Sequence, residues 1–205
     1  MAHREAVSVA IAALASALVV ACGAGPPATP APTSSPVAST AATAAASPTA
    51  PSGGPGVLVD PSLLQILPDS VDGVAIAPEA ETAAQLATDP SLQPSIEALA
   101  MGLAIDATSE GEDLAIITVV RVRPGLLDDA FFRSYRESYD EAACAPAGGV
   151  AGNAESELGG RRVFIGSCEG GAFTYHVVHS GDVIVSVTSL GERRLGEKVM
   201  SALEG

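Results

Sequence analysis

A segment of 34 residues without a charged or aromatic side chain, residues 23–56, limits what this chain can fold into. Pro, Ala, Ser, Thr and Gly make up all of it except Val37. Such a segment cannot bury enough apolar area to offset the entropy lost on ordering, and we expect it to remain disordered. Folding is therefore confined to residues 57–205, a length that can build one hydrophobic core.

The first 21 residues have the layout of a secretory signal peptide. His3 and Arg4 give a short polar start, and the run from Ala6 to Ala21 carries no charge. That run is shorter than the ~20 apolar residues that a membrane-spanning helix needs, and it fits the apolar core of a signal peptide. We therefore predict that residues 1–21 are absent from the mature protein.

The apolar run ends in Val19-Val20-Ala21-Cys22. This sequence resembles the lipobox of bacterial lipoproteins, in which aliphatic and small residues precede a cysteine. The resemblance covers residues 1–22 only. It implies that the Cys22 thiol carries diacylglycerol and that the chain is cut before it. An uncleaved membrane anchor and a coincidental match are the alternatives.

A lipid on Cys22 would place the protein on the extracytoplasmic face of the cell membrane, with the membrane itself as a binding partner. Two or more acyl chains anchor a protein stably, whereas one does not. The lipidated cysteine and the disordered linker together span residues 22–56. As a flexible coil this linker has an end-to-end distance of roughly 30 Å. It is either a bare spacer or a carrier of O-linked sugars on Ser and Thr next to Pro.

The charge balance argues against nucleic-acid binding. The net charge is −14, and the basic residues of the folded part occur as isolated pairs or single residues near acids. A phosphate backbone is repelled by such a chain unless a concentrated basic patch exists. The acids are unevenly distributed, because residues 60–113 hold eleven acids and no base. This acidic half is either a surface for cations or a basic protein, or a device for solubility.

The folded part is predicted to be one α+β domain. We expect strands at 73–78, 112–124, 163–168, 173–179 and 182–188, and helices at 79–87, from 89 to about 103, at 125–144 and from 195. The resulting order is β-α-β-α-β-β-β-α, a mostly antiparallel five-stranded sheet with helices packed on one face. The strand at 112–124 is apolar on both faces, which favours a central position. Residues 145–160 are expected to form a loop.

The second predicted helix depends on the spacing of its apolar residues and on a capping sequence at its start. Leu92, Ile96, Leu99 and Leu103 fall at i, i+4, i+7 and i+11, which is one face of a helix. Asp89-Pro90 supplies a cap followed by proline in the first turn.

The last 45 or so residues, from "LGGRRVFIGSCEGG" to the closing helix, loosely resemble uncharacterised secreted bacterial domains. The shared features are a Gly-Gly-basic strand, a Tyr-containing strand, a Gly-Asp turn and a final helix. The resemblance implies no catalytic residues, so none are assigned.

Cys144 and Cys168 remain as an even pair once Cys22 is lipidated. An even pair in an exported domain predicts a disulfide. Closing this loop would stabilise the fold by roughly 3–4 kcal/mol in the chain-entropy model. Free thiols, a metal site and a redox role are the alternatives.

Other patterns that suggest chemistry are weak. His176 and His179 form H-x-x-H, but in a strand residues three apart point to opposite faces, so a shared metal is disfavoured and a contact of His179 with Asp182 is expected. The acidic stretch 106–113 has Ile117 where a calcium loop requires glutamate, which favours a plain loop. No nucleophile motif or phosphate loop occurs. We therefore assign no catalytic residue, no metal and no cofactor.

Three functions remain open. The first is a membrane-anchored extracytoplasmic lipoprotein whose domain binds a partner, such as an envelope protein, without catalysis. The second is a carrier of a small apolar molecule or lipid, since helices on a sheet can enclose an apolar pocket. The third is an enzyme with an unrecognised site.

Overall fold

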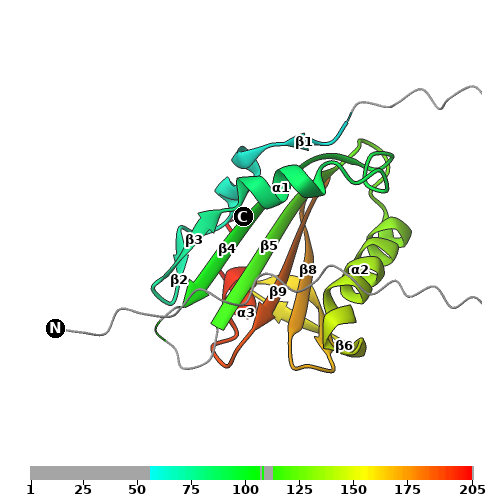
Figure 1. The fold of residues 1–205 in the computed structure, drawn as a ribbon. Helices are drawn as coiled ribbons and strands as arrows, with labels where there is room; N and C mark the ends of the chain where they lie inside the picture. The colour runs from blue at the N-terminus through cyan, green and yellow to red at the C-terminus, as the bar shows by residue number, and fades with distance from the viewer. Residues whose placement is uncertain (1–55, 107, 109–112, 205) are drawn as a thin grey trace, which may run out of the picture. The chain divides into compact units, whose positions relative to one another are not determined.

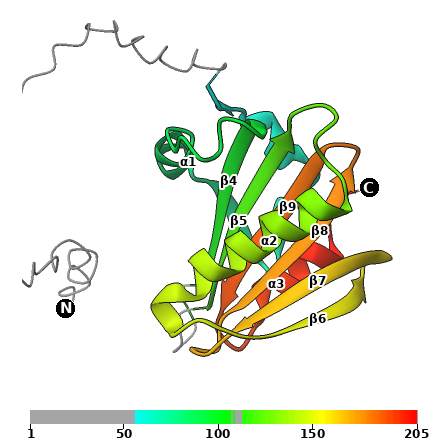
Figure 2. The same ribbon diagram turned by 90° about the vertical axis from the view of Figure 1, so that its right-hand side faces the viewer.

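The computed structural model describes residues 56–106, 108 and 113–204, which form an α+β domain built on one large sheet. The sheet has nine strands: β1 (Leu58–Val59), β2 (Ser70–Val71), β3 (Val74–Pro78), β4 (Ile96–Asp106), β5 (Asp113–Val122), β6 (Val150–Leu158), β7 (Arg161–Cys168), β8 (Phe173–Ser180) and β9 (Val183–Leu190). Their order is β2-β3-β4-β5-β9-β8-β7-β6, and β1 pairs with β4. Every pairing is antiparallel except β1 with β4 (Figures 1 and 2).

The helices are α1 (Ala80–Leu86), α2 (Asp129–Cys144) and α3 (Leu195–Ser201), with 3-10 turns η1 (Pro61–Ile66) and η2 (Ala145–Ala147). The longest, α2, begins where the Asp128 side chain accepts a hydrogen bond from the backbone N–H of Phe131, a typical N-cap. In the part of the chain that the structure describes, no helix is long and apolar enough to cross a membrane.

The two faces of the sheet are covered differently, and they are named here after the helix that covers each. On the α3 face, a large apolar core joins the sheet to η1 and α3, with Leu63, Leu195 and Val199 among its buried members. On the α2 face, α1 and α2 pack on a smaller apolar cluster that includes Ala83 and Phe132. Figure 1 shows α1 and α2 on the near side of the sheet and α3 behind it.

This arrangement corrects two expectations. The α+β class and the antiparallel sheet are confirmed, but the sheet has nine strands, not five, and the helices lie on both faces, not one. The physical reason is visible in β5, where alternate residues serve different cores. Val119 belongs to the cluster under α3, and Val120 belongs to the cluster under α1 and α2. A central strand that is apolar on both sides needs a covering layer on each.

The helix predicted from residue 89 onward is wrong, because residues 96–106 form β4. The helical spacing of Ile96, Leu99 and Leu103 arose in a run that is apolar at nearly every position, so it fits a doubly buried strand equally well. Gly102 suits the strand because a Cβ there would lie 3.2 Å from Ile76 Cγ2 of the adjacent β3. Tertiary packing decided between two local structures that the pattern allows.

The loop predicted at 145–160 is also wrong over most of its length, since Val150–Leu158 forms strand β6. This strand pairs with β7 only and lies at the end of the strand order. Its residues are small or polar and mostly exposed on both sides, so the sequence carries no apolar alternation to reveal it. Edge strands commonly have this composition.

Candidate functional site

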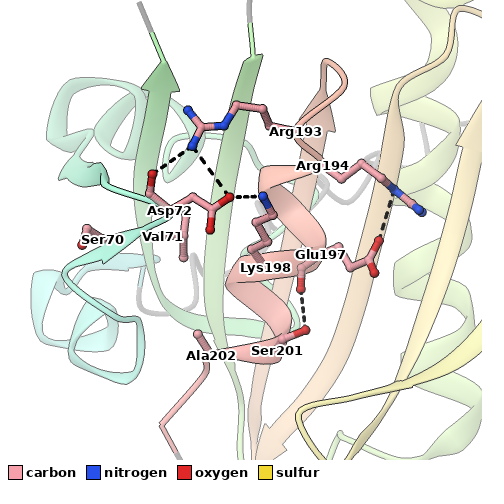
Figure 3. A pocket seen from close by; sticks show the side chains of 9 residues that line it. All are labelled: Ser70, Val71, Asp72, Arg193, Arg194, Glu197, Lys198, Ser201 and Ala202. Atoms are coloured by element: carbon pink, nitrogen blue, oxygen red, sulfur yellow. Dashed lines mark hydrogen bonds and ion pairs between the residues drawn. The ribbon is translucent and has the colours of Figure 1, made fainter. Parts of the chain in front are cut away.

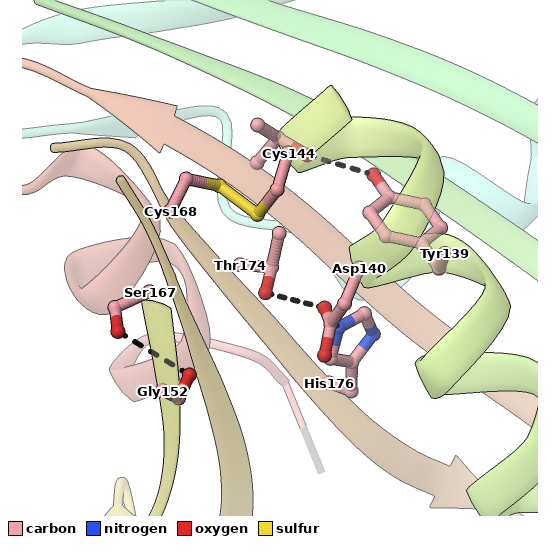
Figure 4. The surroundings of a disulfide bond; sticks show 9 residues. Tyr139, Asp140, Cys144, Gly152, Ser167, Cys168, Thr174 and His176 are labelled. Carbon is pink, nitrogen blue, oxygen red and sulfur yellow. Dashed lines mark hydrogen bonds and ion pairs between the residues drawn. A yellow bond between two sulfur atoms is a disulfide. The ribbon is translucent and has the colours of Figure 1, made fainter. Parts of the chain in front are cut away.

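Four polar side chains converge beneath α2 and are sealed from solvent. Asp140 comes from α2, Thr174 and His176 from β8, and Ser186 from β9. Asp140 Oδ1 lies 2.7 Å from His176 Nε2 and accepts a hydrogen bond from Thr174 Oγ1 at 2.5 Å (Figure 4). His176 Nδ1 lies 2.9 Å from Ser186 Oγ. We call these four residues the buried polar network.

The sheet geometry explains why these residues meet. Thr174 and His176 are two apart on β8 and therefore face the same side, and Ser186 is the register partner of His176 on β9. Gly166 of β7 leaves the room that Asp140 needs, since a Cβ there would lie 3.0 Å from the Asp140 carboxyl carbon. The helix can therefore bring its carboxylate close to the sheet.

Hydrogen bonding keeps the Asp140 carboxylate ionised despite its burial. Burial raises the pKa of Asp140, but the hydrogen bonds from His176 and Thr174, together with the electrostatic attraction of His176 and Arg136, outweigh burial and lower the net pKa. Because the carboxylate only accepts, His176 Nε2 donates to it. In a neutral ring Nδ1 is then the acceptor for the Ser186 hydroxyl.

Tyrosines of α2 close the network on its outer side. The Tyr139 ring lies edge-on to the His176 ring with centroids 5.1 Å apart, and its hydroxyl accepts a hydrogen bond from Thr188. Burial raises the pKa of Tyr139, and hydrogen bonds to Thr188 and Thr118 only partly oppose this rise. The tyrosine hydroxyls above the network therefore stay neutral at physiological pH.

The network contains the residue types of a hydrolase triad, Asp140, His176 and Ser186, in an arrangement that does not suit catalysis. In that triad the carboxylate holds Nδ1–H and the serine faces Nε2, whereas here the two ring nitrogens have exchanged partners. His176 and Ser186 are both 0% exposed, so no substrate carbonyl can reach the hydroxyl without displacing α2. The arrangement can orient and hold α2 on the sheet.

Sequence reasoning considered His176 but not its partners. Asp140 lies four residues after Arg136 in a predicted helix and Ser186 lies in a predicted strand, and neither position belongs to a recognisable motif. A usable signal existed in β8, where Thr174 and His176 occupy the same face of a predicted strand whose other face is apolar. Polar side chains at such positions require partners, and the facing helix is where to look for them.

The predicted disulfide between Cys144 and Cys168 is present. Their Cα atoms are 5.1 Å apart, and the bond ties the last residue of α2 to the last residue of β7. Asp140 lies one helical turn before Cys144, so the disulfide and the buried polar network attach the same end of α2 to the sheet (Figure 4).

The H-x-x-H histidines do not share a site. His176 points toward α2 in the buried polar network, whereas His179 sits at a β-bulge between Val178 and Ser180. The expected contact of His179 with Asp182 is not formed at Nδ1, which is buried without a hydrogen-bond partner. Burial, together with the charge of Arg161, lowers the pKa of His179, so this ring is neutral at pH 7.

A charged groove of about 460 Å³ lies on the α3 face, where residues of α3 meet β2 and the turn after it. Its cations are already engaged, as Figure 3 shows. Arg193 contacts Asp106 and the Asp72 carboxylate, Lys198 contacts Asp72, and Arg194 lies 3.1 Å from Glu197. The hydrogen bond from Lys198 lowers the pKa of Asp72 most, although this carboxylate is exposed. The cations of the groove are therefore paired with carboxylates in this structure.

The acidic stretch 106–113 lies partly outside the described residues. Asp106 accepts hydrogen bonds from the backbone and side chain of Thr108, and the backbone N–H of Arg193 donates to Asp113 at 2.8 Å. Within residues 56–106, 108 and 113–204, no three His, Cys, Asp or Glu side chains come together as a set of metal ligands.

Cys22, the signal sequence and most of the linker fall outside the residues that the structure describes. The assignments of residues 1–21 and 22–56 therefore remain predictions.

Comparison with known proteins assigns no function to the site, so its role is inferred from its own chemistry. The chain matches no protein-family model, and neither a curated protein nor a solved structure is significantly similar to it.

Proposed function

We propose that this protein is a lipoprotein anchored on the extracytoplasmic face of a membrane through Cys22, and that its domain binds another molecule without catalysing a reaction. The disulfide between Cys144 and Cys168 is the observation that carries the proposal. Disulfides persist in oxidising compartments and are rare in the cytosol. An exported domain needs the signal sequence that residues 1–21 supply.

The position of the cysteines supports lipidation of Cys22. Cys144 and Cys168 bind each other, so Cys22 is the one cysteine of the chain left over. It stands directly after the apolar run and directly before the uncharged linker, where a lipid-modified first residue is expected. The linker then separates the membrane from the domain by a distance on the order of 30 Å.

The buried polar network supports a binding role over catalysis. A catalytic set needs an open side from which the substrate approaches the nucleophile. Here Asp140, His176 and Ser186 satisfy one another, and α2 covers them. Opening this site would require separating a helix that a disulfide and two buried hydrogen bonds to Asp140 hold in place.

The anchor is tested by mass spectrometry of the protein purified from bacterial membranes. We expect an N-terminal peptide that starts at Cys22 and carries the mass of acyl chains. A Cys22→Ser variant should appear in the soluble extracytoplasmic fraction, while a Cys144→Ser, Cys168→Ser double variant keeps its lipid and stays on the membrane. An intact Met1, or a free Cys22 thiol in the mature protein, would refute the anchor.

The binding role is tested against its two alternatives by different measurements on the same protein. Native mass spectrometry and organic extraction detect a co-purified lipid or apolar molecule, which would favour a carrier. Turnover in a hydrolase substrate panel that disappears in Ser186→Ala would favour an enzyme. We expect neither a co-purified apolar molecule nor turnover. The buried polar network is enclosed, and the groove beside α3 is charged.

A further inference from the structure

Five apolar side chains, three exposed and two half-buried, lie together on the α2 face of the sheet. They are Leu103 and Ile105 of β4, Leu114 and Ile116 of β5, and Leu190 of β9. The strand register places them together, since Leu103 pairs with Ile116, Ile105 pairs with Leu114, and Leu114 pairs with Leu190. We call these five residues the open apolar patch.

The same strands are fully covered on their other side. Ala104, Ala115 and Ile117 alternate with the patch residues and are each 0% exposed in the core beneath α3. In contrast, Ile105 is 53% exposed, Ile116 38% and Leu190 39%. Helices α1 and α2 cover other parts of the α2 face and leave the lower ends of β4 and β5 open in Figure 1. Contiguous exposed aliphatic side chains favour an interaction site more than scattered ones do.

The surroundings of the open apolar patch are acidic. Glu79 lies at the start of α1, and its backbone N–H donates to Met101, two residues before Leu103 on β4. Glu192 is exposed two residues after Leu190. Residues 60–113, which include β4 and its neighbours β1 to β3, contain no basic residue at all. Asp106 and Asp113, at the ends of β4 and β5 next to the patch, are bound by Arg193, whereas Glu79 and Glu192 present negative charge to a binding partner.

We propose that the open apolar patch docks a segment of another protein that presents aliphatic side chains flanked by Lys or Arg. This inference rests on the binding role proposed above and names its surface and partner class. Burial of the aliphatic side chains supplies affinity, and the basic flanks match the acidic surroundings and set orientation.

Two other occupants fit the charge less well. A second copy of this chain would bring two molecules of net charge −14 together, with acidic surroundings facing acidic surroundings. A membrane surface is usually anionic and repels the same acids. Both remain distinguishable outcomes of the experiment.

The test uses the full mature chain and a designed probe. The probe is an amphipathic helical peptide of about 14 residues, roughly four turns, with Leu on one face and Lys on the other. One control peptide replaces Leu by Gln and keeps the charge, and a second replaces Lys by Glu and keeps the apolar face. Fluorescence anisotropy should show binding of the Leu/Lys peptide, weakening as salt is added, and at least about tenfold weaker binding of both controls.

Variants of the protein assign the binding to the patch. Ile105→Ser with Ile116→Ser should weaken binding of the Leu/Lys peptide at least about tenfold, equivalent to about 1.4 kcal/mol. The matched control is Leu126→Ser with Val178→Ser, two apolar residues that are 42% and 39% exposed elsewhere. It should change the affinity less than about twofold. Unchanged circular dichroism spectra would show that both variants are folded.

Several results would overturn the proposal. They are no binding of the Leu/Lys peptide, equal binding by the two double variants, a dimer in light scattering that Ile105→Ser dissociates, or patch-dependent binding to phosphatidylcholine–phosphatidylglycerol vesicles. None of these decides whether Cys22 is acylated. Equal binding by both variants would leave the binding role intact at another surface, so the failures of the two proposals are distinguishable.

Discussion

The α3 face and the α2 face of the same sheet are held in different ways. The α3 face is closed by apolar packing that extends from η1 to α3. The α2 face carries a smaller apolar cluster, a buried polar network, the disulfide and the open apolar patch. Because its apolar core is the larger one, we expect the α3 face to provide most of the domain's stability. The α2 face fixes one helix by specific bonds and leaves part of the sheet exposed.

The largest effect is expected from the α3 face. Ile117→Ala removes a side chain that is fully buried in its core, and such truncations cost about 4 kcal/mol. Urea unfolding followed by circular dichroism measures the loss. A loss below about 1 kcal/mol would show that this core is not the main source of stability.

A somewhat smaller effect is expected from the disulfide on the α2 face. Cys144→Ala with Cys168→Ala opens a loop with a sequence separation of 24, and the chain-entropy model gives a loss of about 3 kcal/mol. Thermal unfolding of the variant, compared with the wild type before and after reduction, measures this loss. Reduced wild type and variant should behave alike. If reductant leaves the wild-type midpoint unchanged, the bond does not form in the isolated protein.

The buried polar network should contribute less, and in a pH-dependent way. The folded-state pKa of Asp140 is below its usual value of 3.8, so the ionised carboxylate stabilises the fold above about pH 4. That contribution is lost as the pH falls through the lowered pKa. Asp140→Asn should therefore cost about 2 kcal/mol at pH 7 and flatten the acid side of the stability profile.

The neighbouring exposed residue supplies the control for this prediction. Glu141→Gln, on the same helix, should change the unfolding free energy by less than about 0.5 kcal/mol both at pH 7 and below about pH 4. If both variants show the same acid profile as the wild type, the carboxylate of Asp140 is not the group that links stability to pH.

The smallest effect is expected at the open apolar patch. Ile116→Ala should change the unfolding free energy by less than about 1 kcal/mol, because this side chain is already 38% exposed and leaves no enclosed cavity. Ile117, its immediate neighbour on β5, points into the opposite core. Nearly equal losses for Ile116→Ala and Ile117→Ala, measured by the same urea unfolding, would contradict the difference between the two faces.

The sequence predicts β3, α1, β5, α2, β7 to β9 and α3, and it misses the strands β1, β2, β4 and β6. The strands β7, β8 and β9 and the helices α2 and α3 were recognisable because turns with glycine separate short apolar segments. The strand β4 was not, because its apolar residues satisfy helical and strand spacing at once. The two-residue strands β1 and β2 are too short to carry any periodicity, and they exist because β4 and β3 offer them partners.

The candidate functional site was also predicted only in part. The pairing of Cys144 with Cys168 could be predicted because only two cysteines remain in the domain. The buried polar network could not, since Asp140 lies 34 and 36 positions from the residues of β8 that it contacts, and their proximity depends on how α2 crosses the sheet. The open apolar patch requires knowing which parts of a face the helices leave bare, and alternation in β4 and β5 does not contain that information.

The pairing of β5 with β9 has a consequence for how the chain is made. Residues 114–121 bond to residues 183–190, so the central strand waits for a partner about sixty residues further along the chain. At 5–20 residues per second, synthesis takes roughly 3–12 s to cover that interval. During this time a central strand that is apolar on both faces has an unpaired edge, the kind of surface that aggregates. A chain truncated before β9 should therefore be insoluble rather than partly folded.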